Sequence, residues 1–229
     1  VLSTARRMNT LVSDLLDISQ LETGGLKLKI EPVSAAALID ETLGEFEMLA
    51  DQKSIALAYD VDPPDLTFPA DSLRLGQVLS NLVSNGIKYT PEGGQVSVTA
   101  HHRDNGHVIL RVSDTGLGIP PDVVPRLFEK FYRIPDEAYY SQEGTGLGLS
   151  IVQGIVRGAG GRLSAVSQPG IGSTFTICIP AAHPADSKPR RRRRARAPRA
   201  KKSLLPLYAI QRASRLPCPC PESHPMGQG

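Results

Sequence analysis

The chain has 229 residues, and its 26 Lys and Arg against 23 Asp and Glu give a net charge of +3. This total hides an uneven distribution, since residues 183–229 hold twelve basic and two acidic residues, a net charge of +10. Residues 1–182 hold fourteen basic and twenty-one acidic residues, so the body of the chain is acidic with a net charge of −7. No aromatic residues interleave with the arginine run at 190–194, which argues against specific nucleic-acid recognition.

We expect residues 183–229 to be disordered, because like charges and prolines bury too little apolar surface to fold. Two interpretations of this tail stay open: non-specific contact with phosphate groups, and aberrant coding. No apolar run reaches the roughly 18 residues that span a bilayer, so we expect no membrane segment in this chain and a cytoplasmic location. An upstream anchor in a longer protein stays open. The three cysteines form no C-x-x-C pair and predict a reducing compartment without structural disulfides.

The chain begins with one predicted amphipathic helix that ends near Gly24 and Gly25. Its apolar stripe recurs at helical spacing and consists of Met8, Leu11, Val12, Leu15, Leu16 and Ile18. Residues 26–182 then predict a two-layer α/β sandwich with one mixed sheet. The expected strands are 26–31, 54–61, 95–102, 107–113, 161–167 and 172–179, and the expected helices are 34–50, 71–88, 122–130 and 147–158. A tight turn at 104–106 would join the third and fourth strands.

The helix expected over 71–88 has two chemically different faces. Its apolar face consists of Val78, Leu79, Leu82 and Val83, and its polar face of Arg74, Gln77, Asn81, Asn85 and Lys88. At 100° per residue the polar side chains fall within an arc of roughly 80°. Carboxamide oxygens suit a hard cation such as Mg²⁺, and a lysine one turn later suits a phosphate. An ordinary surface helix with polar residues outward is the alternative interpretation.

A first glycine cluster, D-T-G-L-G-I at 114–119, directly follows the apolar strand expected over 107–113. The Asp114 carboxylate can accept a hydrogen bond from an exocyclic amine, and the glycines allow backbone to approach a flat ring. This pattern therefore suits recognition of a nucleotide base. Taken alone, the same pattern is also typical of a tight turn with a capping aspartate, which is the alternative interpretation.

A second glycine cluster, G-T-G-L-G-L at 144–149, leads into the helix expected over 147–158. Glycines that run into a helix present free N–H groups at the positive end of the helix dipole, which favours an anion. The cluster is neither a Walker A loop nor a strand-preceded dinucleotide fingerprint.

Four motifs stand in order: N-x-x-x-N-x-x-K-Y-T-P (81–91), D-T-G-L-G-I (114–119), L-F-E-K-F-Y-R (127–133) and G-T-G-L-G-L (144–149). Together they resemble the N, G1, F and G2 boxes of two-component sensor histidine kinases, an ATP-binding group shared with DNA gyrase, Hsp90 and MutL. The resemblance covers about residues 1–180. It implies an ATP-binding catalytic domain at 26–182 that transfers the γ-phosphate to a histidine, for relay to a response-regulator aspartate.

The resemblance also implies roles for individual residues. Asn85 would be the main Mg²⁺ ligand, with Asn81 as a second candidate, and Asn81 and Lys88 would reach the phosphates while Tyr89 lies beside the nucleotide. Asp114 would bind the adenine amine in a pocket shaped by Gly116 and Gly118. Arg133 would steady the γ-phosphate, so Asn81, Lys88 and Arg133 form the expected catalytic set. The phosphate loop would comprise Gly144, Thr145, Gly146, Leu147 and Gly148. Phe128 and Phe131 would be hydrophobic anchors for a lid over 134–143.

Residues 1–25 resemble the second helix of the family's dimerisation and phosphotransfer hairpin, which implies a homodimer through this helix and a response-regulator receiver domain as partner. An amphipathic helix that packs on its own domain is the alternative. The acceptor histidine of the family precedes this helix, and none of the five histidines here lies in such a position. We therefore expect a fragment, or a record that begins within a gene, that binds ATP without phosphorylating itself.

Position 81 separates two activities within this group of folds. The ATPase branches typically carry a glutamate there that activates water, whereas an amide such as Asn81 is a poor general base near neutral pH. The sequence therefore favours transfer over hydrolysis. Two other functions stay open: an ATPase of the same fold group, and a non-catalytic nucleotide-binding module.

Overall fold

A five-stranded mixed sheet forms the back of the molecule. The computed structural model describes residues 2–23, 26–103, 106–136, 139 and 144–181. The sheet has the strand order β2-β4-β5-β7-β6. Its strands are β2 (Ala56–Asp62), β4 (Gln95–Arg103), β5 (His107–Asp114), β6 (Arg162–Gln168) and β7 (Gly172–Pro180). Only β2 and β4 are parallel, and the other three pairs are antiparallel.

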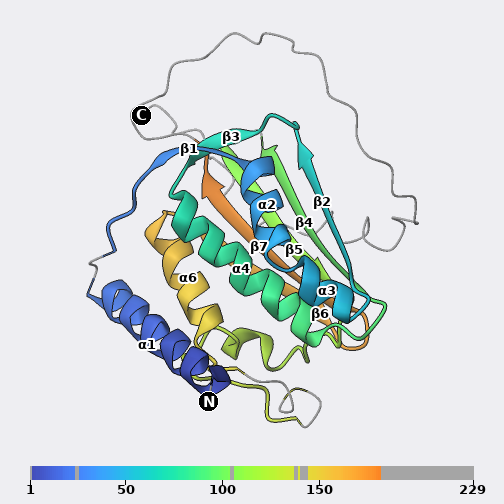
Figure 1. Ribbon diagram of the computed structural model, residues 1–229. Helices are drawn as coiled ribbons and strands as arrows, with labels where there is room; N and C mark the ends of the chain where they lie inside the picture. Colours follow the sequence, from blue (N-terminus) through green and yellow to red (C-terminus); the bar gives the residue numbers. More distant parts are fainter. Residues whose placement is uncertain (1, 24–25, 104–105, 137–138, 140–143, 182–229) are drawn as a thin grey trace, which may run out of the picture.

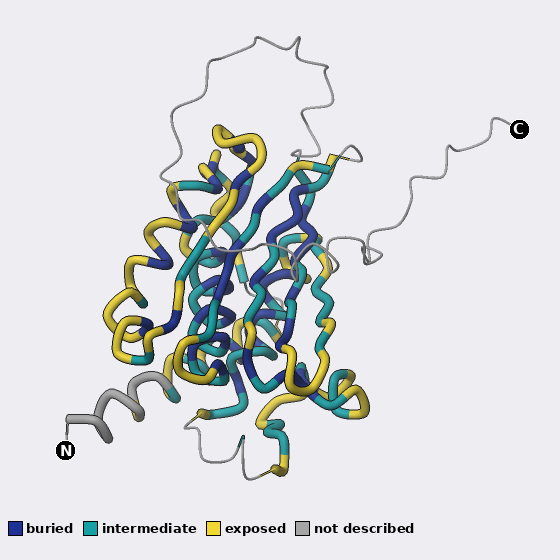
Figure 2. The backbone as a smooth tube through the Cα atoms, turned by 90° about the vertical axis from the view of Figure 1, so that its right-hand side faces the viewer, coloured by how far each residue is buried: buried dark blue, intermediate teal, exposed yellow. Residues whose placement is uncertain are grey.

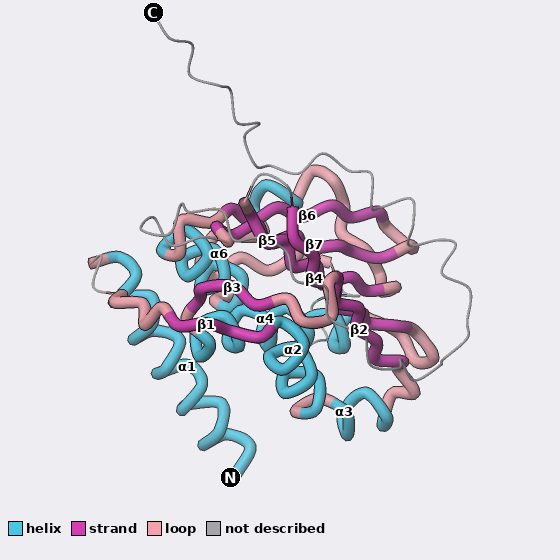
Figure 3. Tube along the Cα trace, turned by 90° about the horizontal axis from the view of Figure 1, so that it is seen from above, coloured by secondary structure: helices cyan, strands magenta, loops and turns pink. Residues whose placement is uncertain are grey.

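Helices cover one face of this sheet (Figures 1 and 3). They are α2 (Ala35–Gly44), α3 (Glu47–Gln52), α4 (Ser72–Tyr89) and α6 (Gly148–Gly158). A small antiparallel sheet of β1 (Glu31–Ser34) and β3 (Thr67–Ala70) lies at one end of the helix layer. The first helix, α1 (Leu2–Glu22), packs beside α6 at the edge of this layer.

The core lies between the sheet and α4. Alternate residues of β4 and β5 face the helices and are buried, including Val98 and Leu110. The apolar face of α4 meets them with four buried side chains, those of Val78, Leu79, Leu82 and Val83. Figure 2 shows the buried backbone concentrated between the two layers. Each such side chain contributes about 1.5–3 kcal/mol when removed from water, so this contact holds α4 in one rotation about its axis.

The predicted two-layer sandwich is confirmed, but four elements differ in detail. Residues 26–30 are extended without pairing, because their backbone meets a partner strand only from Glu31, opposite Ala70. The helix expected over 34–50 is broken after Gly44, a residue that weakens helices. Strand β3 was not predicted, since it has four residues and contains Pro69. The helix expected over 122–130 is only a short 3₁₀ turn at Val124–Arg126, because prolines remove N–H donors.

Several expectations concern residues at or beyond the edge of the described region. Residues 182–229, including the arginine run, lie outside it, as do Asp104 and Asn105 of the predicted turn. Strands β4 and β5 nevertheless pair up to Arg103 and His107, so a hairpin is present. Cys178 on β7 is buried and disulfide-bonded, so the expectation of cysteines without a structural disulfide is wrong. Of the helices that the structure describes, none combines the length and apolar character needed to cross a bilayer.

A lysine caps the carboxyl end of α4, the helix that carries the polar residues. The Lys53 ammonium donates to three backbone carbonyl oxygens: Ile87 at 2.6 Å, Lys88 at 3.2 Å and Thr90 at 3.0 Å. The last carbonyls of a helix have no partner within the helix and carry its negative dipole end. Lys53 therefore fixes the last turn of α4, on which Lys88 lies.

We expect Lys53→Met to lower the free energy of unfolding by about 1–3 kcal/mol, since it leaves partly buried carbonyls unpaired while retaining the aliphatic stem. Urea denaturation would measure this change. Lys27→Met is the matched control, because Lys27 is exposed on the segment before β1. Equal stability of the two variants would contradict a capping role for Lys53.

Candidate nucleotide-binding site

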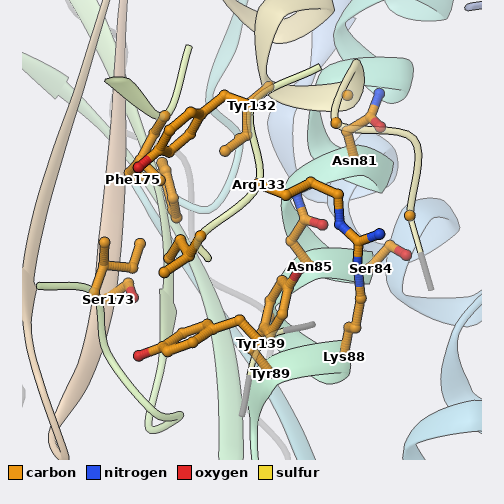
Figure 4. Close-up of a pocket in the computed structure, with 18 of the residues that line it drawn as sticks. Asn81, Ser84, Asn85, Lys88, Tyr89, Tyr132, Arg133, Tyr139, Ser173 and Phe175 are labelled. Carbon is orange, nitrogen blue, oxygen red and sulfur yellow. The ribbon is translucent and has the colours of Figure 1, made fainter. Parts of the chain in front are cut away.

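A cavity of about 310 Å³ opens at the edge of the helix layer, between α4, the segment before α6, and the ends of β5 and β7 (Figure 4). Polar side chains of α4 lie on one side of it, and Ser173 and Phe175 of β7 lie on the opposite side. Its lining includes Asp14, Asn81, Ser84, Asn85, Lys88, Tyr89, Asp114, Gly118, Tyr132, Arg133, Tyr139, Gly144, Thr145, Gly146, Gly148, Ser173 and Phe175. All four sequence motifs therefore meet at one cavity, the Phe-containing motif through Leu127, Tyr132 and Arg133.

One end of the cavity is built around the Asp114 carboxyl group. Its Oδ1 accepts hydrogen bonds from the backbone N–H groups of Gly116 at 2.9 Å and Ser173 at 3.2 Å. Burial raises the pKa of Asp114, and these two N–H donors partly offset the rise. Among the described residues Oδ2 has no hydrogen-bond donor. This oxygen is therefore available to accept a hydrogen bond from an amine in the cavity.

Gly116 supports Asp114 from behind and does not line the cavity. A Cβ added at Gly116 would lie 2.6 Å from the backbone oxygen of Tyr89 and 2.8 Å from Asp114 Oδ1. Only glycine allows the loop to pass this close to the end of α4. Gly118, which does line the cavity, has a φ of +68°, and a Cβ added there would lie 2.0 Å from the Gln168 backbone oxygen.

The other end of the cavity combines amides, a cation and glycine backbone. Asn81 donates from Nδ2 to the Gln77 carbonyl oxygen at 3.1 Å, and a Cβ added at Gly148 would lie 2.8 Å from Asn81 Oδ1. A Cβ added at Gly144 would lie 2.8 Å from Lys88 Nζ. The glycine loop thus passes close to both functional groups of α4, so a larger residue at either glycine would displace the Lys88 or Asn81 side chain.

The loop leads into the amino end of α6, where backbone N–H groups lack partners within the helix. The Thr145 hydroxyl oxygen accepts from the Leu147 backbone N–H at 3.2 Å and closes this turn. Leu147 itself does not line the cavity, because its side chain is fully buried in the core. Neutral oxygens, one ammonium group and a helix amino end together form a surface suited to a polyphosphate and its metal.

Two tyrosines line the cavity, one from α4 and one from the segment after the Phe-containing motif, and Lys88 Nζ lies 4.5 Å from the ring centroid of Tyr89. The rings of Tyr89 and Tyr139 are 6.0 Å apart and tilted by 45°. The Tyr139 hydroxyl donates to the Gly118 carbonyl oxygen at 2.7 Å. The site therefore has an aromatic side beside its amine acceptor, which suits a planar heterocycle.

The Phe-containing motif acts through its backbone as much as its side chains. Phe128 packs against the core as expected, whereas the Phe131 side chain is 62% exposed and is not an anchor. The Phe131 N–H instead donates to the Gly146 carbonyl oxygen at 3.0 Å, and Phe131 adopts a φ of +61°. This bond joins the motif to the glycine loop and brings Arg133 to the cavity wall.

The polar face of α4 serves two different contacts. Asn81, Asn85 and Lys88 line the cavity, but Arg74 and Gln77 bind the Asp17 carboxylate of α1 at 2.7 and 2.6 Å. Sequence reasoning missed Asp14, Ser84, Tyr132, Tyr139, Ser173 and Phe175. Ser173 and Phe175 alternate on β7, so their strand pattern identifies them as facing the helices, but no local signal shows that this end of β7 borders a cavity.

Comparison with known proteins finds one family and several curated relatives that match this chain. Residues 70–183 match the family described as histidine kinase-, DNA gyrase B- and HSP90-like ATPase. Drug sensory protein A of Synechocystis sp. is 37% identical, over 74% of this chain and 26% of that protein. The circadian input-output histidine kinase CikA of Synechococcus elongatus is 38% identical, over 74% of this chain and 23% of that protein.

The chain belongs to the histidine kinase-, DNA gyrase B- and HSP90-like ATPase family. The relatives named above place this ATPase-family chain with the sensor histidine kinases, and it spans about a quarter of their length.

Solved structures share the fold of this histidine kinase-type ATPase domain. The catalytic domain of histidine kinase ThkA matches with a TM-score of 0.60 and 30% identity, over 67% of this chain and 97% of that one. Full-length ShkA in complex with AMPPNP matches with a TM-score of 0.70 and 33% identity, over 79% of this chain and 37% of that one. The expected ATP-binding catalytic domain of a sensor histidine kinase is thus confirmed.

We expect burial of the Asp114 carboxyl group in the cavity to lower the free energy of unfolding at neutral pH. Folding raises the pKa of Asp114, so the ionised carboxylate lowers the free energy of unfolding at neutral pH. This loss of stability becomes smaller as the pH falls toward the ordinary pKa of aspartate, near 4. We expect Asp114→Asn to raise the free energy of unfolding by up to about 1 kcal/mol at pH 7.5, and by less at pH 5. Urea denaturation at the two pH values would measure this. A variant less stable than the parent at pH 7.5 would contradict the expectation.

Proposed function

We propose that this domain binds Mg-ATP in the cavity described above and transfers the γ-phosphate to a histidine side chain. The observation that carries the proposal is the pairing of two unlike ends in one cavity. One end offers a buried carboxylate oxygen for an amine beside aromatic rings, and the other offers Lys88, amides and glycine backbone. Adenine and a triphosphate need these two environments at the two ends of one site.

At the base end, Asp114 Oδ2 would accept a hydrogen bond from the adenine amine. Tyr89 would lie beside the adenine ring, and Gly118 would leave room for the ring in the pocket. At the phosphate end, Lys88 and the N–H groups of Gly144, Thr145, Gly146 and Gly148 would contact phosphate oxygens. Arg133, which lines the same wall, would neutralise charge on the γ-phosphate during transfer. Positioning and charge neutralisation supply most of the catalysis in phosphoryl transfer.

Asn85 fits the role of principal magnesium ligand, with Asn81 as the second. Both side chains come from one face of α4 and line the cavity beside the glycine loop. Amide oxygens are ligands that Mg²⁺ accepts together with phosphate oxygens and water, and the metal would reduce the negative charge of the phosphates. Asn81 Oδ1 faces the loop because its Nδ2 is held by the Gln77 carbonyl oxygen.

We propose a longer kinase as the setting for this domain, with residues 26–182 as its catalytic unit and residues 183–229 as a tail. The exposed apolar side chains of α1, which include Met8, Val12, Leu15 and Leu16, support a homodimer formed through this helix. A response-regulator receiver domain would take the phosphate onward. One structural relative, ThkA at 26% identity and a TM-score of 0.60, is seen in complex with its response regulator TrrA. A cytoplasmic location fits both partners.

Nucleotide binding tests the site directly. We expect Asn85→Ala to weaken ATP binding at least tenfold in the presence of Mg²⁺ and little in its absence, because it removes a metal ligand. Asp114→Ala would weaken binding of ATP and adenosine alike. Isothermal titration would measure both, with Gln52→Ala on exposed α3 as the control. Unchanged affinity in both site variants would contradict the proposed site.

Transfer rather than hydrolysis is the second expectation. With Asn81 in place of a general base, the chain alone should release phosphate from ATP at no more than about one turnover per minute, because no side chain at position 81 activates the attacking water. A phosphate-release assay without a histidine acceptor would measure this. Rapid turnover of ATP under these conditions would favour the ATPase alternative over the kinase.

A further inference from the structure

Helix α1 is docked on the catalytic domain by contacts along its second half. The Asp17 carboxylate binds Arg74 Nη1 at 2.7 Å and Gln77 Nε2 at 2.6 Å on α4. Ile18 is buried against the domain core. The Leu21 side chain packs so closely on Gly154 of α6 that a Cβ there would lie 2.6 Å away. Glu22 pairs with Lys130.

These contacts bring Asp14, one helical turn before Ile18, into the wall of the cavity. Asp14 Oδ2 accepts a hydrogen bond from the Thr145 hydroxyl at 3.3 Å. Thr145 belongs to the glycine loop, between Gly144 beside Lys88 and Gly148 beside Asn81. Asp14 therefore lies beside the glycine loop, at the end of the cavity proposed for the phosphates.

The surroundings of Asp14 already disfavour its charge. Partial burial raises the pKa of Asp14, the Thr145 hydrogen bond partly offsets this, and the carboxylate of Asp17 raises it further. Arg74 does not relieve Asp14, because it is engaged by Asp17. A triphosphate at the glycine loop would add several negative charges near this carboxylate, and like charges in a partly desolvated site repel strongly.

We propose that Asp14 belongs to the nucleotide site as an antagonist: while α1 is docked, its carboxylate weakens triphosphate binding. This inference rests on the proposed ATP-binding function and adds a residue to that site. ATP binding and α1 docking oppose each other, so by linkage the triphosphate favours release of α1 to the same extent that docking weakens its binding.

Asp14 could instead strengthen ATP binding, by holding the glycine loop in place through its hydrogen bond with Thr145. Asp14→Asn separates the two roles, because it removes the charge and keeps an oxygen that accepts from the Thr145 hydroxyl. We expect this variant to bind ATP about three- to tenfold more tightly, ADP less so, and adenosine unchanged. Glu47→Gln on exposed α3 makes the same charge change away from the cavity and should leave all three affinities unchanged.

Isothermal titration of the full chain with Mg-ATP, Mg-ADP and adenosine would test this. Unchanged or weaker ATP binding by Asp14→Asn, or an equal gain for adenosine, would overturn the inference while leaving the proposed function intact. Absence of ATP binding by the parent chain would overturn the proposed function and the inference together.

A double-mutant cycle with Asp17→Ala tests the dependence on docking. Removal of the Asp17 carboxylate breaks both hydrogen bonds to α4 and loosens α1. We expect Asp17→Ala to tighten ATP binding by itself, and the gain from Asp14→Asn to fall below half of its value in that background. A gain that stays the same in both backgrounds would overturn the requirement for a docked helix.

Discussion

The burial of one face of α4 against the sheet is the constraint on which the site depends. Because Val78, Leu79, Leu82 and Val83 are all buried, the helix cannot rotate about its axis, and its opposite face must carry Asn81, Asn85 and Lys88 toward the glycine loop. The loop lies so close to these side chains that a Cβ at Gly144 or Gly148 would displace Lys88 Nζ or Asn81 Oδ1. Lys53 holds the end of the same helix in register.

The sequence predicted this arrangement where the signals were local. The polar stripe of α4 and the two glycine clusters each have a short-range pattern, and all three border the cavity. The pattern could not show that the stripe is divided, since Arg74 and Gln77 have the same periodicity as Asn81 but bind α1. Which residues of the stripe line the cavity depends on where α1 packs, and the Asp17 of α1 that binds Arg74 is almost sixty residues away in the sequence.

Other misses have equally specific causes. Leu26, Leu28 and Ile30 alternate as a strand would, yet a strand needs a backbone partner, and none pairs with these residues in the described structure. Phe131 reads as an apolar anchor, but its backbone bond to Gly146 turns the side chain outward. Ser173 and Asp114 meet only because β5 and β7 are neighbours in the sheet, a pairing set by topology.

Helix α1 combines the two interpretations that its sequence left open. Asp14, Asp17, Ile18 and Leu21 form the face that contacts the catalytic domain, and Met8, Val12, Leu15 and Leu16 are exposed. At 100° per residue these two faces point about 150° apart, so the helix can hold its own domain on one side and a second helix on the other.

Because the two faces lie on opposite sides of α1, a contact on the exposed face can rotate the helix and move the side chains on the docked face. A second helix that turned α1 by about 20° would move a side chain at a radius of about 6 Å by roughly 2 Å. Such a displacement exceeds what the 3.3 Å hydrogen bond between Asp14 and Thr145 can absorb. A small rotation of α1 by a partner on the exposed face would therefore move the Asp14 carboxylate away from the glycine loop and change the charge there. The sheet need not move.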